Sequence, residues 1–316
     1  MRLPCPSTKR KVVSCAVLFG LLIFTHHYLF YEPPGYICPY FRGRLGNLMF
    51  IYASVYGIAK SKGMVLVVDT NDLIQTVFPN LNALAIDSAF YFCNSSRLVY
   101  ERRACAYDID TMQFDNKKNT TLKAYLQSWK YFKDVEKEIR RQFVFKQEVQ
   151  DKAQAIINNY TREYIQHSNI SNNLQIIGVH IRRGDYLKPG KIAFGYKVAT
   201  KSYLYKAFKF FRSKFKNCLF LIFTAPNRVD LKWRKYHMNG SDVINVDANE
   251  RDVDMCALSK CNHTIITVGS FGWWSAWLNQ GMTIYYNDVV KPNSYLSRDF
   301  SADMKDYFPS SWIGMQ

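Results

Sequence analysis

Short apolar runs alternate with helical stripes of apolar residues along the second half of the chain. The run Ile176–Ile181 is rich in β-branched residues and is typical of a buried strand. Later segments place apolar residues three and four positions apart, which is typical of a helix with one buried face. Strands that alternate with helices predict a parallel, doubly wound α/β sheet. We expect strands at Ile176–Ile181, Cys218–Phe223, Val243–Val246, Thr264–Val268 and Thr283–Tyr286, and helices at Ser202–Phe215, Asp252–Lys260 and Trp273–Asn279, the last capped by Gly281.

The first half of the chain is less regular. Apolar residues between Leu48 and Ile58 recur at helical spacing, and Met64–Asp69 is typical of a strand. Residues 70–121 hold short apolar runs without a clear period, whereas residues 131–164 are charged and mostly helical in pattern. The segment Ser168–Asn173 is polar and turn-rich, so we expect the linker between two domains there.

The segment Val12–Tyr31 is almost entirely apolar and follows several basic residues. A stretch of about 20 apolar residues is long enough to span a bilayer. The positive-inside rule then predicts a cytoplasmic tail of residues 1–11, a transmembrane signal anchor of residues 12–31 and a lumenal chain after it. A cleaved signal peptide is the alternative, but Thr25-His26-His27 lacks the small residues of a cleavage site.

Two further features are typical of the secretory pathway. Six Asn-x-Ser/Thr triplets without proline are candidate glycosylation sites, at Asn94, Asn119, Asn159, Asn169, Asn239 and Asn262. An even number of cysteines follows the apolar segment, and these residues can form disulfides in an oxidising compartment: Cys38, Cys93, Cys105, Cys218, Cys256 and Cys261. Their pairing stays open at this point.

The formal net charge of +17 raises the question of nucleic-acid binding. The sequence holds no basic block and no zinc-finger spacing, so we expect no nucleic-acid partner. We interpret the excess charge as a surface that attracts anionic substrates or membranes.

The end of the strand Ile176–Ile181 carries the densest candidate chemistry. It delivers His180, Arg182, Arg183 and Asp185 to the carboxyl edge of the predicted sheet, where open α/β folds place their ligands. Guanidinium groups bind phosphate oxygens in a bidentate manner, so a polyphosphate fits this pair of arginines. The simpler interpretation is that one arginine pairs with Asp185 and braces the turn. We expect one arginine to serve the ligand and the other the scaffold.

Two glycine-containing segments precede expected helices. Gly43-Arg44-Leu45-Gly46-Asn47 precedes the first, and Gly269-Ser270-Phe271-Gly272 lies between a strand and the helix Trp273–Asn279. Free N–H groups at a helix start favour anions, although glycine also serves tight packing turns. The pairs Asp108-Ile-Asp110 and Asp252-Val-Asp254 match the Asp-x-Asp pattern of metal-dependent glycosyltransferases. Neither follows a convincing strand, and we assign no metal site.

Three of these segments carry a resemblance to a known family. His180-Ile-Arg-Arg-Gly-Asp-Tyr186, Gly43-Arg-Leu-Gly-Asn-Leu-Met49 and Cys261–Gly272 resemble the signature blocks of the α-1,2-fucosyltransferases, glycosyltransferase family 11. The resemblance runs in order from about Tyr40 to Phe308–Ile313. It implies a GT-B-like α/β fold with two facing Rossmann-like domains after the transmembrane helix. Residues 32–170 would form the acceptor-side domain and residues 171–316 the GDP-fucose-binding domain.

The resemblance also implies an activity. The family is expected to transfer L-fucose from GDP-fucose to a terminal galactose of a glycan, with inversion, without a metal and without a cofactor, since GDP-fucose is a substrate. The expected location is the Golgi membrane, as a single-pass type II protein with a lumenal catalytic domain. Residues 70–169 match nothing in the family pattern that we can place, so the acceptor sugar stays open.

Site roles follow from the resemblance, position by position. Arg182 would clamp the β-phosphate with Arg183 as its support, and it would stabilise the departing GDP. Asp185 is the nearest candidate for a general base. The remaining assignments place His180 and Asp254 at the guanosine, Ser270 and Phe271 along the diphosphate, and Asn47 with Gly43 and Arg44 in the cleft near fucose.

Two alternatives remain at this stage. Another GDP-fucose enzyme, acting on protein or on core N-glycan, shares the arginine motif, but the block Gly269–Trp277 favours the α-1,2 type. A catalytically silent sugar-binding protein of the same fold is the other alternative, and intact Arg182, Arg183 and Asn47 argue against it.

Overall fold

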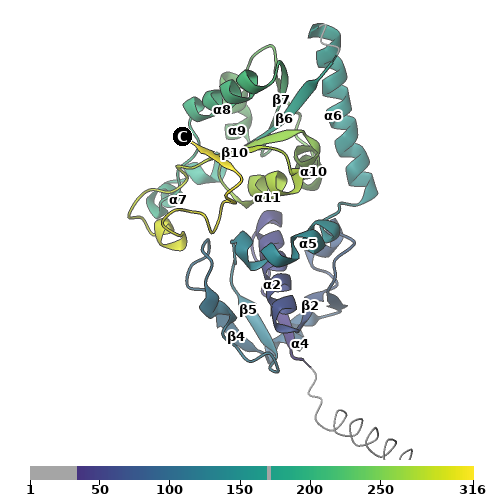
Figure 1. Ribbon diagram of the computed structural model, residues 1–316, viewed down its shortest axis with the longest axis vertical. Helices are drawn as coiled ribbons and strands as arrows, with labels where there is room; N and C mark the ends of the chain where they lie inside the picture. The colour runs from purple at the N-terminus through teal and green to yellow at the C-terminus, as the bar shows by residue number, and fades with distance from the viewer. Residues whose placement is uncertain (1–33, 169–171) are drawn as a thin grey trace, which may run out of the picture.

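The computed structural model describes residues 34–168 and 172–316. Figure 1 shows two α/β lobes stacked along the long axis of the molecule, with helix α11 (Ser270–Asn279) lying over helix α2 (Leu45–Lys62) at the junction. The signal-anchor prediction for residues 12–31 and the candidate site Asn169 lie outside the described residues. Within the described ranges, no helix has both the length and the apolar character needed to cross a membrane.

The first lobe is a five-stranded, all-parallel sheet in the order β3-β2-β1-β5-β4. Helix α2 is buried on nearly every side because it packs between this sheet and α11. Residues 70–121, which showed no clear period, form only short elements. The strands are β1 (Tyr36–Pro39), β2 (Val65–Asp69), β3 (Leu84–Ile86), β4 (Arg97–Tyr100) and β5 (Thr120–Lys123); the helices are α2, α3 (Leu73–Val77), α4 (Ala89–Asn94) and α5 (Glu136–Gln142), with 3₁₀ turns η1 (Ile109–Met112), η2 (Trp129–Tyr131) and η3 (Lys133–Val135).

The second lobe is a six-stranded, all-parallel sheet in the order β11-β10-β9-β6-β7-β8. Every strand and helix expected in this half is present, within a few residues. Numbered from β6 as the first strand, the order is 3-2-1-4-5-6, that of the Rossmann fold. The strands are β6 (Leu174–Ile181), β7 (Asn217–Thr224), β8 (Val243–Asn245), β9 (His263–Ile266), β10 (Thr283–Tyr286) and β11 (Ile313–Met315); the helices are α6 (Gln147–Ser168), α7 (Pro189–Phe194), α8 (Lys201–Lys214), α9 (Arg228–His237), α10 (Arg251–Lys260) and α11, with turns η4 (Gly184–Leu187) and η5 (Leu296–Asp299).

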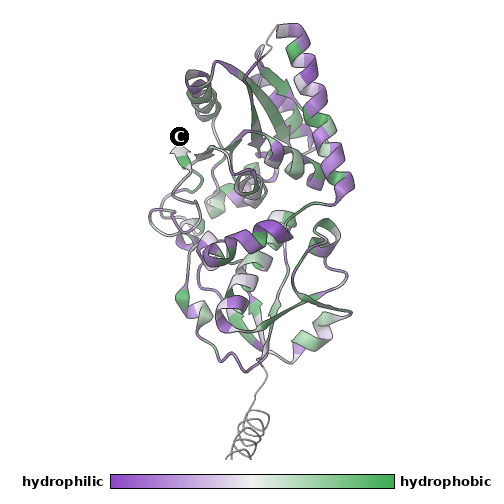
Figure 2. Ribbon diagram, turned by 45° about the vertical axis from the view of Figure 1, so that its right-hand side comes forward, coloured by the Kyte–Doolittle hydropathy of each residue, from purple (hydrophilic) through white to green (hydrophobic). Residues whose placement is uncertain are grey.

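Two segments link the lobes beyond the junction of α2 with α11. Helix α6 comes before the expected linker but packs against α10 of the second sheet, with hydrophilic residues on its outer side (Figure 2). The chain after β10 returns to the first lobe, where Lys130 pairs with Asp306 at 2.5 Å and Ser128 Oγ donates to the Asp306 carbonyl at 2.7 Å. One hydrophobic core therefore runs through both lobes. The domain division at residue 170 stays a prediction.

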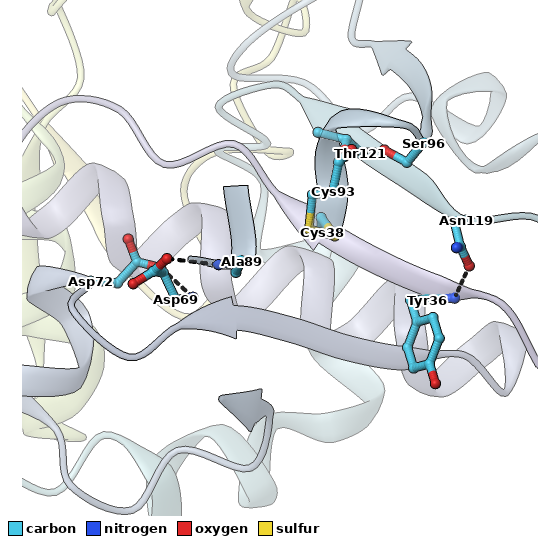
Figure 3. The surroundings of a disulfide bond; sticks show 9 residues. All are labelled: Tyr36, Cys38, Asp69, Asp72, Ala89, Cys93, Ser96, Asn119 and Thr121. Carbon is cyan, nitrogen blue, oxygen red and sulfur yellow. Dashed lines mark hydrogen bonds between the residues drawn. A yellow bond between two sulfur atoms is a disulfide. The ribbon is translucent and has the colours of Figure 1, made fainter. Parts of the chain in front are cut away.

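One disulfide fastens the first lobe. It joins Cys38 at the end of β1 to Cys93 on α4, as Figure 3 shows. Nearby, the Asp69 carboxylate accepts the Ala89 N–H at 2.8 Å, which anchors the start of α4. The described free cysteines, Cys105, Cys218, Cys256 and Cys261, are buried.

The block Gly269–Gly272 differs from expectation. Helix α11 begins at Ser270 rather than at Trp273, because Gly269 turns the chain with φ +99° between β9 and the helix. Ser270, Phe271 and Gly272 therefore form the first turn of α11, and their N–H groups are those of the helix N-terminus. The cap is also different: Gln280 takes the left-handed conformation (φ 62°). Gly281 is needed instead for close packing, since a side chain there would collide with the Asn262 carbonyl.

Candidate active site

Each sheet has a switch point, where the strand order reverses and a crevice opens at the carboxyl ends of two neighbouring strands. In the second sheet this point lies between β6 and β9, and in the first sheet between β1 and β5. The four loops that follow these strands face one another across the junction of the lobes. They enclose a cavity of about 410 Å³, to which the segment 289–308 adds a wall. Six of the predicted site residues line it: Gly43, Arg44, Asn47, Arg182, Asp185 and Ser270.

Arg182 and Arg44 meet at one carboxylate. Arg182 Nη2 donates to the Asp185 carboxylate at 2.8 and 3.0 Å, and Arg44 Nη2 from the other lobe donates to it at 2.8 Å. Burial acts to raise the pKa of Asp185, but the two guanidinium groups outweigh it and hold the pKa below its usual value. Asp185 therefore stays ionised and orients Arg182, whose side chain is only 16% exposed.

Arg183 has a different environment from its neighbour. Its Nη1 donates to the Ala199 carbonyl at 2.7 Å, and its guanidinium lies 4.3 Å from the centre of the Trp233 ring. Arg183 does not line the cavity. Arg183 therefore lies in the scaffold, whereas Arg182 binds Asp185 and lines the cavity. That one arginine serves a ligand stays a prediction.

Two helix N-termini converge on the cavity. Gly46 in the first turn of α2 lies against the backbone of Ser270 in the first turn of α11, so closely that a Cβ on Gly46 would approach the Ser270 carbonyl carbon to 2.7 Å. The first N–H groups of a helix lack partners within the helix and carry partial positive charge. With Arg182 and Arg44 beside them, these two helix ends form an electropositive site suited to a diphosphate.

Asn47 connects the two lobes. Its Oδ1 accepts the Ser270 hydroxyl at 2.6 Å and the Gln127 side-chain amide at 3.1 Å. Gln127 lies in the loop after β5, and the sequence does not predict it because its region shows no periodic pattern. The three side chains lie together at the boundary of the cavity.

Comparison with known proteins identifies the family. The family model of glycosyl transferase family 11 matches residues 39–316. The chain belongs to glycosyl transferase family 11. This confirms the family resemblance found in the sequence.

Relatives of this family 11 chain are named for one activity. It is 28% identical over 283 residues to a galactoside 2-alpha-L-fucosyltransferase SEC1 of Bos taurus, covering 87% of this chain and 72% of the relative. It is 26% identical over 284 residues to a galactoside alpha-(1,2)-fucosyltransferase 2 of Sus scrofa, covering 87% and 78%. Among solved structures, NodZ alpha-1,6-fucosyltransferase with GDP is 16% identical, with a TM-score of 0.49 and coverage of 82% and 99%.

Besides Arg183, three predicted donor contacts of the family 11 chain lie outside the cavity: His180, Phe271 and Asp254. His180 is buried and its ring lies 5.1 Å from that of Phe271; burial, helped by Arg182, lowers its pKa to about 3, so the imidazole is neutral. Asp254 lies in the first turn of α10 and accepts the Asn249 amide at 3.2 Å, and burial raises its pKa to about 6. The guanosine and diphosphate roles of these residues stay predictions.

The cavity also has lining residues that the sequence did not indicate. Tyr125 comes from the loop after β5, while Tyr196 and Asp299 come from segments outside the signature blocks. Asp299 accepts the Ala104 N–H at 3.4 Å, and burial raises its pKa. Tyr186 lies within a signature block without a predicted role, and its ring lies 4.9 Å from the Arg182 guanidinium. No periodic signal marks these residues, because they lie in loops and short 3₁₀ turns.

The two carboxylates of the Asp-x-Asp pair, Asp108 and Asp110, both bind the guanidinium of Arg102. Arg102 Nη2 donates to Asp108 at 2.7 Å and to Asp110 at 2.6 Å. Among the described residues, no three His, Cys, Asp or Glu side chains are grouped as a metal ion requires. The candidate glycosylation residues within the described ranges are exposed: Asn94, Asn119, Asn159, Asn239 and Asn262.

Proposed function

We propose that this chain is a Golgi galactoside α-1,2-fucosyltransferase that transfers L-fucose from GDP-fucose to a terminal galactose of a glycan. One observation carries the proposal: the signature segments after β1, β6 and β9 are far apart in the sequence, yet they line one cavity between two parallel sheets. The names of the relatives support galactose as the acceptor and position 2 as the linkage. The arrangement of two facing switch points supports a GT-B-like architecture.

The donor side of the reaction requires stabilisation of a departing GDP. Negative charge grows on the leaving diphosphate as the anomeric C–O bond breaks. Arg182 is a half-buried cation that lines the cavity, and the first turns of α2 and α11 add N–H groups. These groups are fixed before the reaction, so they favour the transition state with little reorganisation.

The acceptor side requires a base for the attacking hydroxyl in an inverting displacement. Among the described residues, the cavity lining offers two carboxylates, Asp185 and Asp299. Asp185 is engaged by two guanidinium groups and has a lowered pKa, which makes it a weak base. Asp299 has one long hydrogen bond and a raised pKa, so it is better suited to accept a proton. We assign the base to Asp299 and the orientation of Arg182 to Asp185.

The proposal includes no metal and no cofactor, because protein groups supply the positive charge and GDP-fucose is a substrate.

The proposal also includes a Golgi membrane location with a lumenal catalytic part. The disulfide between Cys38 and Cys93 supports an oxidising lumen. A chain that starts at Glu32 behind a cleavable signal should be secreted, while the full chain should stay membrane-bound. Release of the full chain without residues 12–31 would contradict the anchor.

The activity is tested by incubating the purified full chain with GDP-fucose and a glycan array. We expect fucose on galactose-terminated glycans, removable by an α-1,2-specific fucosidase. Fucose found only on protein or on core N-glycan would replace the acceptor assignment. Binding of GDP-fucose without transfer to any glycan would favour the silent sugar-binding alternative.

A further inference from the structure

The loop after β5 is held in a conformation that its sequence does not favour. Leu126 is fully buried and has φ +50°, a left-handed conformation that is rare and strained for a bulky residue. The N–H groups of Tyr125 and Leu126 donate to the Glu101 carboxylate at 2.5 and 2.7 Å, and the Leu126 carbonyl accepts the Ser54 hydroxyl at 2.8 Å. These bonds hold Leu126 in the strained conformation directly before Gln127. The strain points to a requirement for a fixed position of the Gln127 side chain.

Gln127 has a defined orientation. Its backbone N–H donates to the Ala104 carbonyl at 2.8 Å, and the Cys105 thiol lies 3.6 Å from its Oε1. Burial raises the pKa of the Cys105 thiol, which therefore stays protonated and donates to Oε1. Because Oε1 faces a donor, the Nε2 end of the amide is directed to Asn47 Oδ1.

Asn47 is oriented in turn. Its Oδ1 accepts two donors, Gln127 Nε2 and Ser270 Oγ. The Ser270 hydroxyl could also accept a hydrogen bond, but a reversed amide would place its NH₂ against Gln127 Nε2, which only donates, so Gln127 fixes the orientation. Its Nδ2 lies on the side of Gly43, where a Cβ would collide with it. No hydrogen bond between Nδ2 and another described residue is present, and Asn47 lines the cavity.

We propose that Gln127 is a positioning residue of this enzyme: it fixes the Asn47 amide so that Nδ2 donates into the cavity, toward the sugar diphosphate. The relay runs from the Cys105 thiol through the Gln127 amide to Asn47 Oδ1. It connects the switch point of the first sheet with the first turn of α11 through Ser270. The inference deepens the proposed function and rests on it.

Gln127→Glu is the decisive variant, because it keeps the shape of the side chain but cannot donate to Asn47 Oδ1 when ionised. The Asn47 amide would then turn its NH₂ to the introduced carboxylate and present a carbonyl to the cavity. We expect kcat for fucose transfer to fall about 10- to 100-fold, as for loss of an oriented polar donor. Gln127→Ala leaves Ser270 to hold the carbonyl, so it should lose less. Gln113→Glu, an exposed glutamine of the same lobe, is the matched control and should behave as wild type.

A double-variant cycle separates this role from a structural one. If Gln127 acts through Asn47, Gln127→Glu should cost less than about threefold in the Asn47→Ala background, because the two losses share one interaction. Thermal midpoints should differ by less than about 2 °C. Losses that multiply, or Gln127→Glu turnover within twofold of wild type, would overturn the inference. A wild-type chain that transfers no fucose would instead contradict the proposed function, so the two failures are distinguishable.

Discussion

The second lobe and the first lobe both bring loops from a switch point to the cavity, but the chemistry of these loops differs. The loops after β6 and β9 bring a half-buried guanidinium, Arg182, its carboxylate partner and a helix N-terminus. The segment after β1, which includes the first turn of α2, and the loop after β5 bring two neutral amides, Asn47 and Gln127, and the exposed Arg44. The second lobe thus supplies fixed charge, and the first lobe supplies oriented hydrogen bonds.

This difference follows from the sequences of the two lobes. A buried charge needs a rigid, hydrogen-bonded support, and the long strand β6 with its parallel neighbours provides it. Neutral amide side chains can be carried by shorter strands, but neighbouring groups must fix which way the amide oxygen and nitrogen point. The comparison implies that removing charge from the second lobe has the largest effect on transfer, and that changes in the first lobe have graded, smaller effects.

Arg182→Ala should have the largest effect. The substitution removes the half-buried cation beside the leaving diphosphate, so we expect about 10²–10³-fold loss of kcat, or roughly 2–4 kcal/mol. Arg182→Lys should restore little, because an ammonium cannot reproduce the guanidinium fork that binds Asp185 and phosphate. Initial rates with saturating GDP-fucose measure this. Near wild-type turnover of Arg182→Ala would remove Arg182 from the reaction.

Asp299→Asn tests whether the segment after β10 contributes the base. We expect about 10²-fold loss of kcat, the usual size of general base catalysis. The pKa of Asp299 is raised by burial, so activity should rise with pH through a value above that of an ordinary aspartate, and the variant should lose this acid limb. Asp185→Asn should keep the limb, since the pKa of Asp185 is lowered. The opposite pattern would return the base role to Asp185.

The sequence predicts the second lobe better than the first, and the reason lies in the strands of the two lobes. In the second lobe, the long, apolar and largely buried strands β6 and β7 leave a strong pattern, so the sequence predicts them closely. In the first lobe, β5 is only Thr120–Lys123 and two of its four residues are threonine. Nothing in that pattern places Gln127 at a switch point. The position of Asp299 depends on the return of the chain after β10, which no local pattern encodes.

The same limit applies inside the signature blocks. The residue types identify Arg182 and Arg183 as a pair but do not distinguish them. Only the packing of Arg183 on Trp233 and its bond to Ala199 assign it to the scaffold. The start of α11 is predicted three residues late because serine, phenylalanine and glycine carry no strong helical pattern, and the left-handed turn at Gly269 decides it.

Arg44→Ala compares two arginines on one carboxylate. Arg44 and Arg182 both bind Asp185 at 2.8 Å, but the side chain of Arg44 is 69% exposed and that of Arg182 only 16%. Water and salt screen the exposed pair, so we expect a loss of less than about 1 kcal/mol, or up to about fivefold in kcat/KM. The effect should shrink further at high ionic strength. A loss as large as that of Arg182→Ala would show that the first lobe also supplies essential charge.

Removal of metal should have the smallest effect. A departing GDP needs its charge neutralised either by a divalent cation or by fixed protein groups. Here Arg182 and the first turns of α2 and α11 occupy the cavity, whereas Asp108 and Asp110 are bound to Arg102 elsewhere in the first lobe. Transfer from GDP-fucose should therefore persist in excess EDTA. Asp108→Ala combined with Asp110→Ala should leave donor affinity almost unchanged, which calorimetry with GDP can measure. Loss of activity in EDTA with recovery on adding Mn²⁺ would mean that the fixed charge of the second lobe does not neutralise the departing GDP by itself. The second lobe would then need a bound cation as well.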